Sequence, residues 1–194
     1  TGTATKLLIH SDQSDYLYYE RNPTRTNIVQ TASQKAGSWS EGSLDLTSTT
    51  SRLYFNNLPT SFYSSNSNTF TIEGWYRPSV DVSSGIYGVW GSTDHYLSCR
   101  LNAGEIKLSH GSGGSWSTTD HATGVTLSQN TWTHFATVYD GSKFMFFKDG
   151  TYQSGKDLTV SVTAKSDFDI GAQPGGPNDF VGYIDEFRIS DNAR

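Results

Sequence analysis

QNTWTHFATVYDGSKFMFFKDGTYQSG, residues 129–155, is the stretch of sequence that decides the fold. Over residues 131–139 aromatic and β-branched side chains recur with period two, which predicts a β-strand with two different faces. Asp140-Gly141 then supplies the small residues that a tight turn needs, residues 143–148 return as an aromatic strand, and Asp149-Gly150 turns the chain again. The stretch therefore predicts an antiparallel β-ribbon.

A ribbon of this kind is only marginally stable in water, so the rest of the chain must supply a sheet that covers its aromatic faces. The composition agrees with an all-β fold, since 34% of the 194 residues are hydrophobic, 13% are aromatic and 17% are charged. Abundant Ser, Thr and Gly favour many short strands joined by polar loops over amphipathic helices. We expect one all-β domain over residues 1–194, with little helix.

Charge, cysteine content and hydropathy exclude several classes of function. The formal net charge is -5 and no Lys/Arg cluster occurs, which disfavours nucleic-acid binding. Cys99 is the only cysteine, which excludes an intrachain disulfide and a thiolate zinc site, so we expect it to be buried in a strand. No apolar run approaches the roughly 20 residues of a membrane span, so membrane insertion is not expected.

Short strands are predicted along most of the chain. They lie at residues 6–9, 43–46, 51–55, 69–77, 86–90, 96–101, 105–110, 116–119, 124–127, 158–162, 167–170 and 180–189. Residues 20–43 show no sustained periodicity and predict a long ordered loop with one strand at 27–30. Gly74, inside a strand, predicts a bulge or a close approach of another chain segment. About a dozen strands fit two packed antiparallel sheets.

Three segments, taken in order, resemble a known family. They are residues 70–75 (FTIEGW), residues 132–136 (WTHFA) with 148–150 (KDG), and residues 170–171 (IG) followed by 180–189 (FVGYIDEFRI). Their order and spacing are similar to those of the laminin G-like, concanavalin A-like jelly roll. The resemblance spans nearly the whole chain and implies a two-sheet antiparallel β-sandwich. Because this fold serves lectins, adhesion modules, polysaccharide-cleaving enzymes and virion surface proteins, function must be argued from sites.

The chain lacks the carboxylate pattern of the glycosidases that share this fold. Those enzymes place acids at alternate positions of one strand, in the order Glu-X-Asp-X-Glu. Asp167 and Asp169 are two residues apart, but residue 171 is glycine, while Asp185 and Glu186 are adjacent and should point to opposite faces. The five His residues show no spacing typical of a zinc site. We therefore predict that the protein is not an enzyme.

Oxygen-rich segments near both ends of the chain make a structural calcium ion one interpretation. Calcium takes about six to eight oxygen ligands and tolerates irregular geometry. Asp12 and Asp15 lie in the first such loop. The family resemblance implies an ion that ties the first strands to the last, with Asp185 as the matching residue. The alternative, of equal weight, is that Asp185 pairs with Arg188 or another Arg and that the loop aspartates are solvated.

A candidate glycan site lies before the central ribbon. Aromatic rings stack on the apolar face of a sugar, while Asn, Asp, Arg and His bond its hydroxyl groups. The candidates are Trp90, Asp94, His95, Tyr96, Arg100 and Trp116. Trp116 follows a glycine-rich loop and should be the most exposed of them. The alternative is that these aromatics belong to the core, to which we assign Ile72, Trp75, Trp132, Phe135 and Ile184.

The sequence favours a non-catalytic glycan- or surface-binding module. We expect an appendage or adhesion component of a phage or bacterial surface assembly, on the virion surface or the cell exterior. The main alternative is a structural virion decoration or tail-fibre protein, whose partners are neighbouring subunits, including copies of itself. The segment at residues 20–43 separates these hypotheses, because packing on its own domain favours a self-sufficient module and an extended arm favours assembly.

Overall fold

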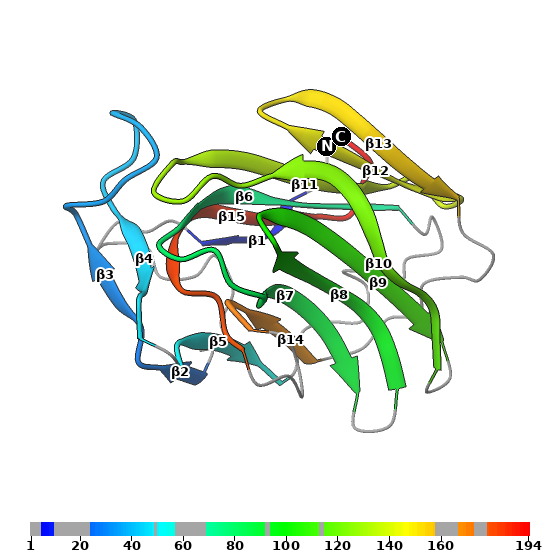
Figure 1. The fold of residues 1–194 in the computed structure, drawn as a ribbon, viewed down its shortest axis with the longest axis horizontal. Helices are drawn as coiled ribbons and strands as arrows, with labels where there is room; N and C mark the ends of the chain where they lie inside the picture. The colour runs from blue at the N-terminus through cyan, green and yellow to red at the C-terminus, as the bar shows by residue number, and fades with distance from the viewer. Residues whose placement is uncertain are drawn as a thin grey trace.

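The computed structural model describes residues 5–9, 24–48, 50–56, 69–91, 94–112, 115–157, 167–172 and 178–194. Fifteen β-strands and no helix occur within these ranges. Figure 1 shows the strands arranged as two sheets that face each other across one hydrophobic core, the all-β sandwich that the sequence predicts. The described part of the chain holds no helix long and apolar enough to cross a membrane.

The eight-stranded sheet carries the predicted ribbon at one edge. Its order is β13-β12-β11-β6-β15-β4-β3, and β1 also pairs with β15. The bounds are Thr5–Ile9 for β1, Val29–Thr31 for β3, Ser43–Leu46 for β4, Phe70–Pro78 for β6, Thr133–Tyr139 for β11, Lys143–Lys148 for β12, Thr151–Asp157 for β13 and Gly182–Ser190 for β15. This order places the long strands β11, β6 and β15 side by side.

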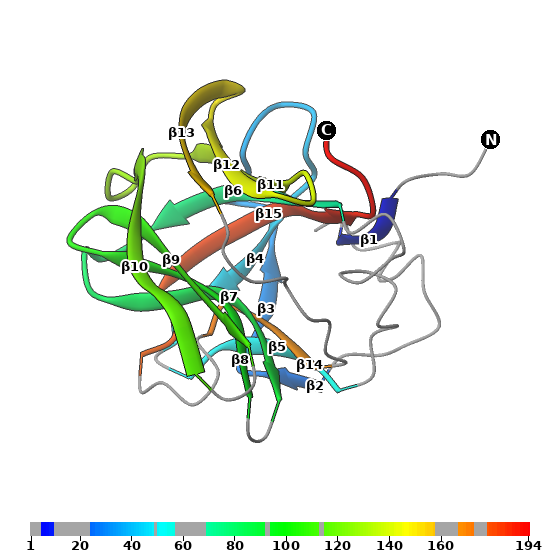
Figure 2. The ribbon, with the colours of Figure 1, turned by 90° about the vertical axis from the view of Figure 1, so that its right-hand side faces the viewer.

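The seven-stranded sheet forms the other layer. Its order is β10-β9-β8-β7-β14-β5-β2. The bounds are Thr24–Thr26 for β2, Arg52–Phe55 for β5, Ser84–Gly91 for β7, Asp94–Asn102 for β8, Glu105–Ser112 for β9, Ser115–Thr126 for β10 and Asp167–Ile170 for β14. In Figure 2 its long strands curve below the eight-stranded sheet, and the loop between β3 and β4 rises above the outer face of the latter.

Two Asp-Gly turns close the ribbon of β11, β12 and β13, as the sequence predicts. Asp140 Oδ1 accepts hydrogen bonds from the backbone N–H groups of Ser142 and Lys143, both at 2.9 Å. At the second turn Asp149 and Gly150 both have positive φ, 48° and 77°, which is what a two-residue type I′ turn requires. Local chemistry therefore sets the register of the ribbon.

Large aromatic side chains fill the core between the sheets. The largest fully buried ones are Tyr76, Tyr87, Tyr139, Phe70, Phe135, Phe144, Phe146, Phe168, Phe180 and Phe187. Fully burying one such apolar side chain stabilises the fold by about 1.5–3 kcal/mol. The core predictions for Ile72, Phe135 and Ile184 are confirmed, because all three are inaccessible to solvent.

Trp75 and Trp132 lie outside the core, so their assignment to it is wrong. In β6 the core positions are Phe70, Ile72 and Tyr76, which leaves Trp75 on the outer face of the sheet. Trp132 precedes β11 and is half-buried. Period-two alternation separates two faces but does not say which one meets the partner sheet, and here aromatic side chains occupy both.

Gly74 and Cys99 have the packing roles expected of them. A Cβ on Gly74 would lie 3.2 Å from Tyr76 Oη and 3.4 Å from Phe187 Cα, so the glycine marks a close approach of two strands. The register of β6 on β11 is regular there, but the register of β6 on β15 shifts at this position, so a bulge lies in β15 opposite Gly74. Cys99 is buried in β8, and burial raises the pKa of its thiol, which makes the thiol unreactive.

Two of the predicted strand boundaries differ from the structure. The segments predicted at 116–119 and 124–127 fall in one continuous strand, β10. The pairing of β10 with β9 is irregular between them. The single strand predicted at 27–30 is replaced by β2 and β3, because Asn27 between them has a φ of 48°. The strand predicted at 158–162 lies outside the described residues.

The described part of the predicted long loop packs on its own sandwich. Strand β2 pairs with β5, and β3 pairs with β4, so each sheet receives one strand from this segment. Ser51 Oγ donates a hydrogen bond to the Asn27 carbonyl oxygen at 2.8 Å, which fixes the chain between the two strands. Residues 24–43 are therefore part of the fold and not an extended arm.

Replacing Phe135 with Ala should cost about 3–5 kcal/mol of unfolding free energy, because the change empties a fully buried aromatic site. Trp132→Ala, at a half-buried position just before the same strand, should cost less than about 2 kcal/mol. Urea denaturation of both variants measures the difference. Equal losses would place Trp132 in the core after all.

Asp169 is a buried carboxylate with an incomplete set of hydrogen bonds. It is 4% exposed, and its Oδ1 has no hydrogen-bond partner. Burial raises the pKa of Asp169 to about 6; Arg52 opposes this shift, and Asp179 and Asp167 add to it. Since the native pKa lies above the unfolded value of about 4, the native state binds more protons between these two pH values. The contribution of Asp169 to stability therefore falls as the pH rises from about 4 to about 6.

Asp169→Asn should raise the unfolding free energy at pH 7 by about 1–3 kcal/mol, because it removes a charge that is costly to bury. The gain should disappear below pH 4, where the native carboxyl group is already neutral. Urea titrations at the two pH values test this, with the exposed Asp81 changed to Asn as the control. An equal gain at both pH values would mean that the effect is not one of ionisation.

Candidate functional site

Most of the predicted glycan-site residues come from one end of the seven-stranded sheet. In the register of β7 on β8, Trp90 lies opposite His95, and Asp94 and Tyr96 flank that position. Trp116 of β10 pairs with the last part of β9, at the same end. The structure does not describe the side chains of the four residues on β7 and β8, so their role as a stacking platform stays a prediction.

Arg100 is not brought to this group. It is four residues from Tyr96 on β8, which separates them by about 13 Å along the strand. Its Nε donates to Asp120 Oδ1 at 2.8 Å, and its Nη2 contacts Asp120 Oδ2, so the guanidinium is held in an ion pair. Trp116 lies in β10, in agreement with the strand predicted at 116–119, but it is half-buried and not the exposed side chain that we expect from its position after a glycine-rich loop.

A pocket lies on the outer face of the eight-stranded sheet, over its long central strands. Its volume is about 180 Å³. We call it the outer-face pocket, and its lining comes from four separate segments of the chain: Trp39, Glu73, Trp75, His134, Glu186 and Arg188. It combines two indole rings with ionisable groups of both signs, which is the mixture typical of a small-molecule binding site.

The register of β11, β6 and β15 aligns the residues of the pocket. His134 lies opposite Trp75 on one side, and Asp185 lies opposite Trp75 on the other, so the three form one row across the sheet. Glu73 lies opposite Arg188 in a second row. Directly opposed residues approach within about 5 Å, and the Trp75 and His134 rings accordingly meet edge to face with centroids 5.4 Å apart.

A β-bulge in β15 directs neighbouring side chains to the outer face. Ile184 and Phe187 are both fully buried in the core, so two residues lie between them where simple alternation allows one. The register against β6 shifts between Asp185 and Arg188, and Glu186 takes up the extra position with a φ of 48°. Bulges commonly redirect side chains next to functional sites. The expectation that Asp185 and Glu186 point to opposite faces holds for a regular strand and fails here.

Glu73 is the centre of a charge network in the pocket. Arg188 donates through Nε and Nη2 to Glu73 Oε1, at 2.9 and 2.6 Å, and His134 Nε2 lies 3.4 Å from Glu73 Oε2. Burial alone would raise the pKa of Glu73, but hydrogen bonds from His134 and Arg188 outweigh it and lower the pKa to about 2. Glu73 is therefore an anion at neutral pH, and the partner of Arg188 is Glu73.

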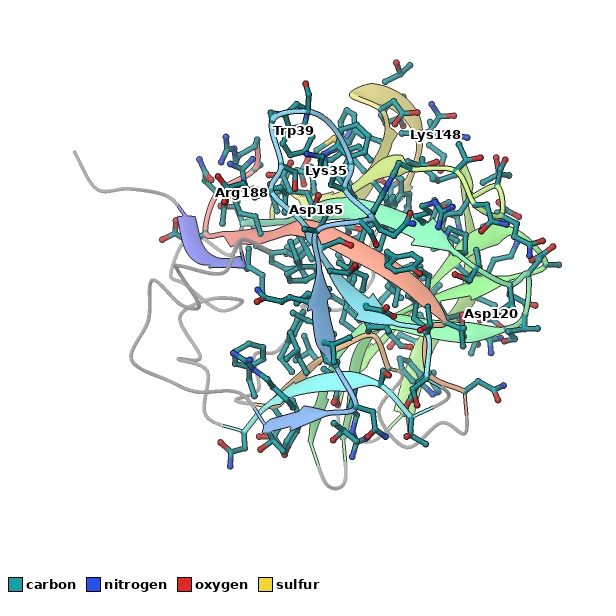
Figure 3. All side chains as sticks on the ribbon, turned by 90° about the vertical axis from the view of Figure 1, so that its left-hand side faces the viewer. Lys35, Trp39, Asp120, Lys148, Asp185 and Arg188 are labelled. Carbon is teal, nitrogen blue, oxygen red and sulfur yellow. The ribbon has the colours of Figure 1, made fainter. Side chains whose placement is uncertain are left out.

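The loop between β3 and β4 carries Trp39 over the pocket. The Trp39 indole is 57% exposed, and its centroid lies 5.8 Å from that of Trp75, with the two planes tilted by 50°. A Cβ on Gly37 would collide with this indole, so the ring position requires glycine there. Ala36 N–H donates to Asp185 Oδ2 at 3.0 Å, which ties the loop to β15. Figure 3 shows the loop standing above β15, with Trp39 at its top and Asp185 below it.

Sequence reasoning missed this pocket although two signals were present. Glu73 and Arg188 are charged residues inside strongly apolar strands, and such groups need a partner when they are partly buried. Trp39 lies in a run of small and polar residues, at 37–43, that offers a large ring little local packing. No local pattern shows that these segments meet, because the contacts join residues far apart in the sequence, such as Glu73 and Arg188, which are 115 positions apart.

Of the three predicted calcium ligands, the structure describes Asp185. Asp12 and Asp15 lie outside the described residues. Asp185 is 1% exposed and accepts the Ala36 hydrogen bond. Within the described ranges no group of three or more His, Cys, Asp or Glu side chains could hold a metal ion, and the calcium site at Asp185 stays a prediction.

Residues 57–194 match the Laminin_G_3 family model, which is described as the concanavalin A-like lectin/glucanases superfamily. The match covers more than half of the chain, and the two-sheet sandwich agrees with it. The chain belongs to the concanavalin A-like lectin/glucanases superfamily. The family resemblance and the jelly-roll fold predicted from the sequence are thereby confirmed. No curated protein sequence matches this superfamily member.

Solved structures of toxin binding domains share the fold. The binding domain of Paraclostridial Mosquitocidal Protein 1 is 15% identical, with a TM-score of 0.73 over 98% of this chain and 49% of that one. The binding domain of botulinum neurotoxin DC is 11% identical in two complexes. With rat synaptotagmin II its TM-score is 0.72 over 98% and 49% of the two chains, and with SialylT it is 0.71 over 98% and 48%. The chain spans about half the length of these structures, and identities this low establish the fold alone.

Calcium should raise the melting temperature if the ion predicted at Asp12, Asp15 and Asp185 exists. At a calcium concentration 100 times the dissociation constant, binding to the native state adds about 2.7 kcal/mol to the unfolding free energy. Thermal melts with excess calcium and with EDTA measure the effect. Identical melting temperatures in calcium and in EDTA would contradict the calcium prediction. The role of Asp185 would then be to hold the Trp39 loop through its hydrogen bond with Ala36.

Proposed function

We propose that this protein is a non-catalytic module that binds a glycan in the outer-face pocket. One observation carries the proposal: Trp39 is held, largely exposed, at an angle over Trp75 beside an ordered Glu73–Arg188 pair. Exposed indole faces stack on sugar rings, and fixed carboxylate and guanidinium groups accept and donate hydrogen bonds to hydroxyl groups. The geometry thus supplies both parts of a sugar-binding site.

The charge state of Glu73 excludes this residue as the general acid of a glycosidase. A glycosidase needs a carboxylic acid that is still protonated near neutral pH to donate to the leaving oxygen. Arg188 and His134 instead hold the pKa of Glu73 at about 2, despite the opposing effect of burial. Such a group can accept hydrogen bonds from a ligand but cannot act as the general acid.

The structural neighbours support a binding role in general terms. They include receptor-binding domains of clostridial toxins, and their complexes contain a sugar in one case and a protein receptor in another. Half of each neighbour lies outside the matched region, so the positions of those ligands are not transferred to this chain. The likeness supports a binding module and leaves the ligand to be argued from the pocket.

The proposal includes a setting on the virion surface or the cell exterior, in an appendage or adhesion component of a phage or bacterial assembly. Low charge and Ser/Thr/Gly-rich loops support it, as does the absence of the expected catalytic pattern from the sequence. The rival is a structural capsid decoration or tail-fibre protein that contacts neighbouring subunits or copies of itself. Packing of residues 24–43 on their own sandwich favours the self-sufficient module.

Trp39→Ala and Trp75→Ala should each weaken glycan binding by about 1–3 kcal/mol, because each removes a large stacking surface at the centre of the site. Trp39→Ala should leave the melting temperature nearly unchanged, because that ring is largely exposed. Tyr152→Ala is the matched control, since Tyr152 is 56% exposed and does not line the pocket. A glycan array with the purified wild type identifies the ligand, and calorimetry then compares the variants. If both Trp variants bind the glycan with the affinity of the wild type, the binding site lies elsewhere on the protein.

A further inference from the structure

A histidine occupies a core position in the seven-stranded sheet. Ile106, Leu108 and His110 alternate along β9 and are all buried, so they form one inward-facing row. His110 is 1% exposed, and its ring packs against Phe144 of β12, with the two centroids 5.9 Å apart. Neither of its ring nitrogens has a hydrogen-bond partner among the described residues. A leucine would fill this position without leaving polar atoms unpaired, so the histidine calls for an explanation.

A second histidine lies close to it on the next strand. In the register of β10 on β9, His121 lies opposite Leu108, which is the next inward-facing residue from His110. The half-buried His121 ring packs against Phe146, with centroids 5.8 Å apart, and its Nε2 is buried and unpaired within the described part of the chain. Phe144 and Phe146 stack on each other. Both imidazoles are therefore held against one aromatic layer of β12.

The two histidines lie where the edges of the two sheets meet. Strand β10 ends the seven-stranded sheet and β13 ends the eight-stranded one, on the same side of the sandwich in Figures 1 and 2. We call the contact of β10 with β12 and β13 the edge seam. Side chains cross it: Ser154 Oγ donates to the Thr123 carbonyl oxygen at 2.5 Å, and Lys148 Nζ to that of Thr126 at 2.8 Å. No backbone ladder joins β10 to β13 in the described ranges, so the seam can open without breaking a sheet.

The charge nearest to the two histidines is positive. Lys156 of β13 lies opposite Phe144. Burial, Lys156 and His121 lower the pKa of His110 to about 4, and burial and Lys156 also lower the pKa of His121, where Glu105 opposes the shift without outweighing it. The other charged side chains described on β8, β9, β10, β12 and β13 are Arg100, which pairs with Asp120, Lys107, which pairs with Glu105, and Lys143, Lys148 and Asp157. None of these groups bonds to His110.

We propose that the edge seam is an acid-sensitive latch, which is closed while His110 and His121 are neutral and opens when they take up protons. An imidazolium has two N–H donors and a charge, and at His110 the described residues offer neither an acceptor nor a carboxylate. Opening the seam brings both rings into water and away from Lys156. Because the native pKa of His110 lies below the unfolded value of about 6.5, the native state binds fewer protons, and stability is lost as the pH falls from about 6.5 to about 4. The latch is separate from glycan binding, since neither histidine lines the outer-face pocket.

Hydrogen exchange of the full chain, measured by mass spectrometry at pH 7.5 and pH 4.5 and corrected for intrinsic rates, tests the latch. Amide protection in β10 and β13 should fall about 50-fold at the lower pH, which is the change expected for a histidine shifted to this extent. It should also lie below the protection of β6 and β15 at the centre of the other sheet. Protection that is unchanged with pH, or equal in the four strands at pH 4.5, would overturn the latch.

His110→Leu should reduce the 50-fold loss to about fivefold or less, because it keeps the packing and removes the titrating group. Lys156→Gln leaves both rings in place and should also reduce the loss, because it removes the charge that opposes protonation. Lys143→Gln is the matched control, since Lys143 is a half-buried lysine of the same ribbon that does not act on either histidine, and it should leave the loss unchanged. Asp169 titrates in the same range but is present in every variant, so its effect cancels. A wild-type loss in His110→Leu, or equal effects of the two lysine changes, would overturn the proposal.

Discussion

The bulge at Glu186 is the constraint on which the site depends. Strand β15 must keep Ile184 and Phe187 in the core, and without an extra residue these two would face opposite sides of the sheet. The positive φ of Glu186 absorbs that residue at some cost in backbone strain. In return Arg188 reaches Glu73, and Asp185 faces the loop that carries Trp39. The Glu73–Arg188 ion pair and the position of the Trp39 loop therefore both depend on this bulge in β15.

The fold could be predicted from the sequence because its signals are local. Alternation over residues 131–139 and the Asp-Gly turns at Asp140 and Asp149 are chemistry within a few residues, and the structure shows their hydrogen bonds and φ angles. The predictions that are wrong concern which face of a strand points into the core. The preference of large aromatic residues for the core predicts that Trp75 lies inside, yet it is Tyr76, one residue later, that faces inward. Only packing against the other sheet decides whether Trp75 or Tyr76 points into the core.

The candidate site could not be predicted for a different reason. Its six lining residues come from four segments that span Trp39 to Arg188, so none of its contacts follows from sequence spacing. The residues predicted instead, such as Trp90 and His95, are close in sequence and pair across one hairpin. Sequence reasoning therefore favours clusters within one hairpin and misses sites that cross several strands. A bulge adds to the difficulty, because one extra residue reverses the expected face of each side chain after it.

The outer-face pocket is hard to explain as a contribution to stability. A partly buried ion pair such as Glu73–Arg188 rarely stabilises a fold more than apolar residues of similar size would. Trp39 leaves more than half of its surface in water, so it gains little from burial, yet its position requires glycine at residue 37 and a buried anchor at Asp185. Three costly features that converge on one small cavity are better explained by ligand binding than by folding. The same reasoning separates this face from the core, where Phe135 and its aromatic neighbours are fully buried.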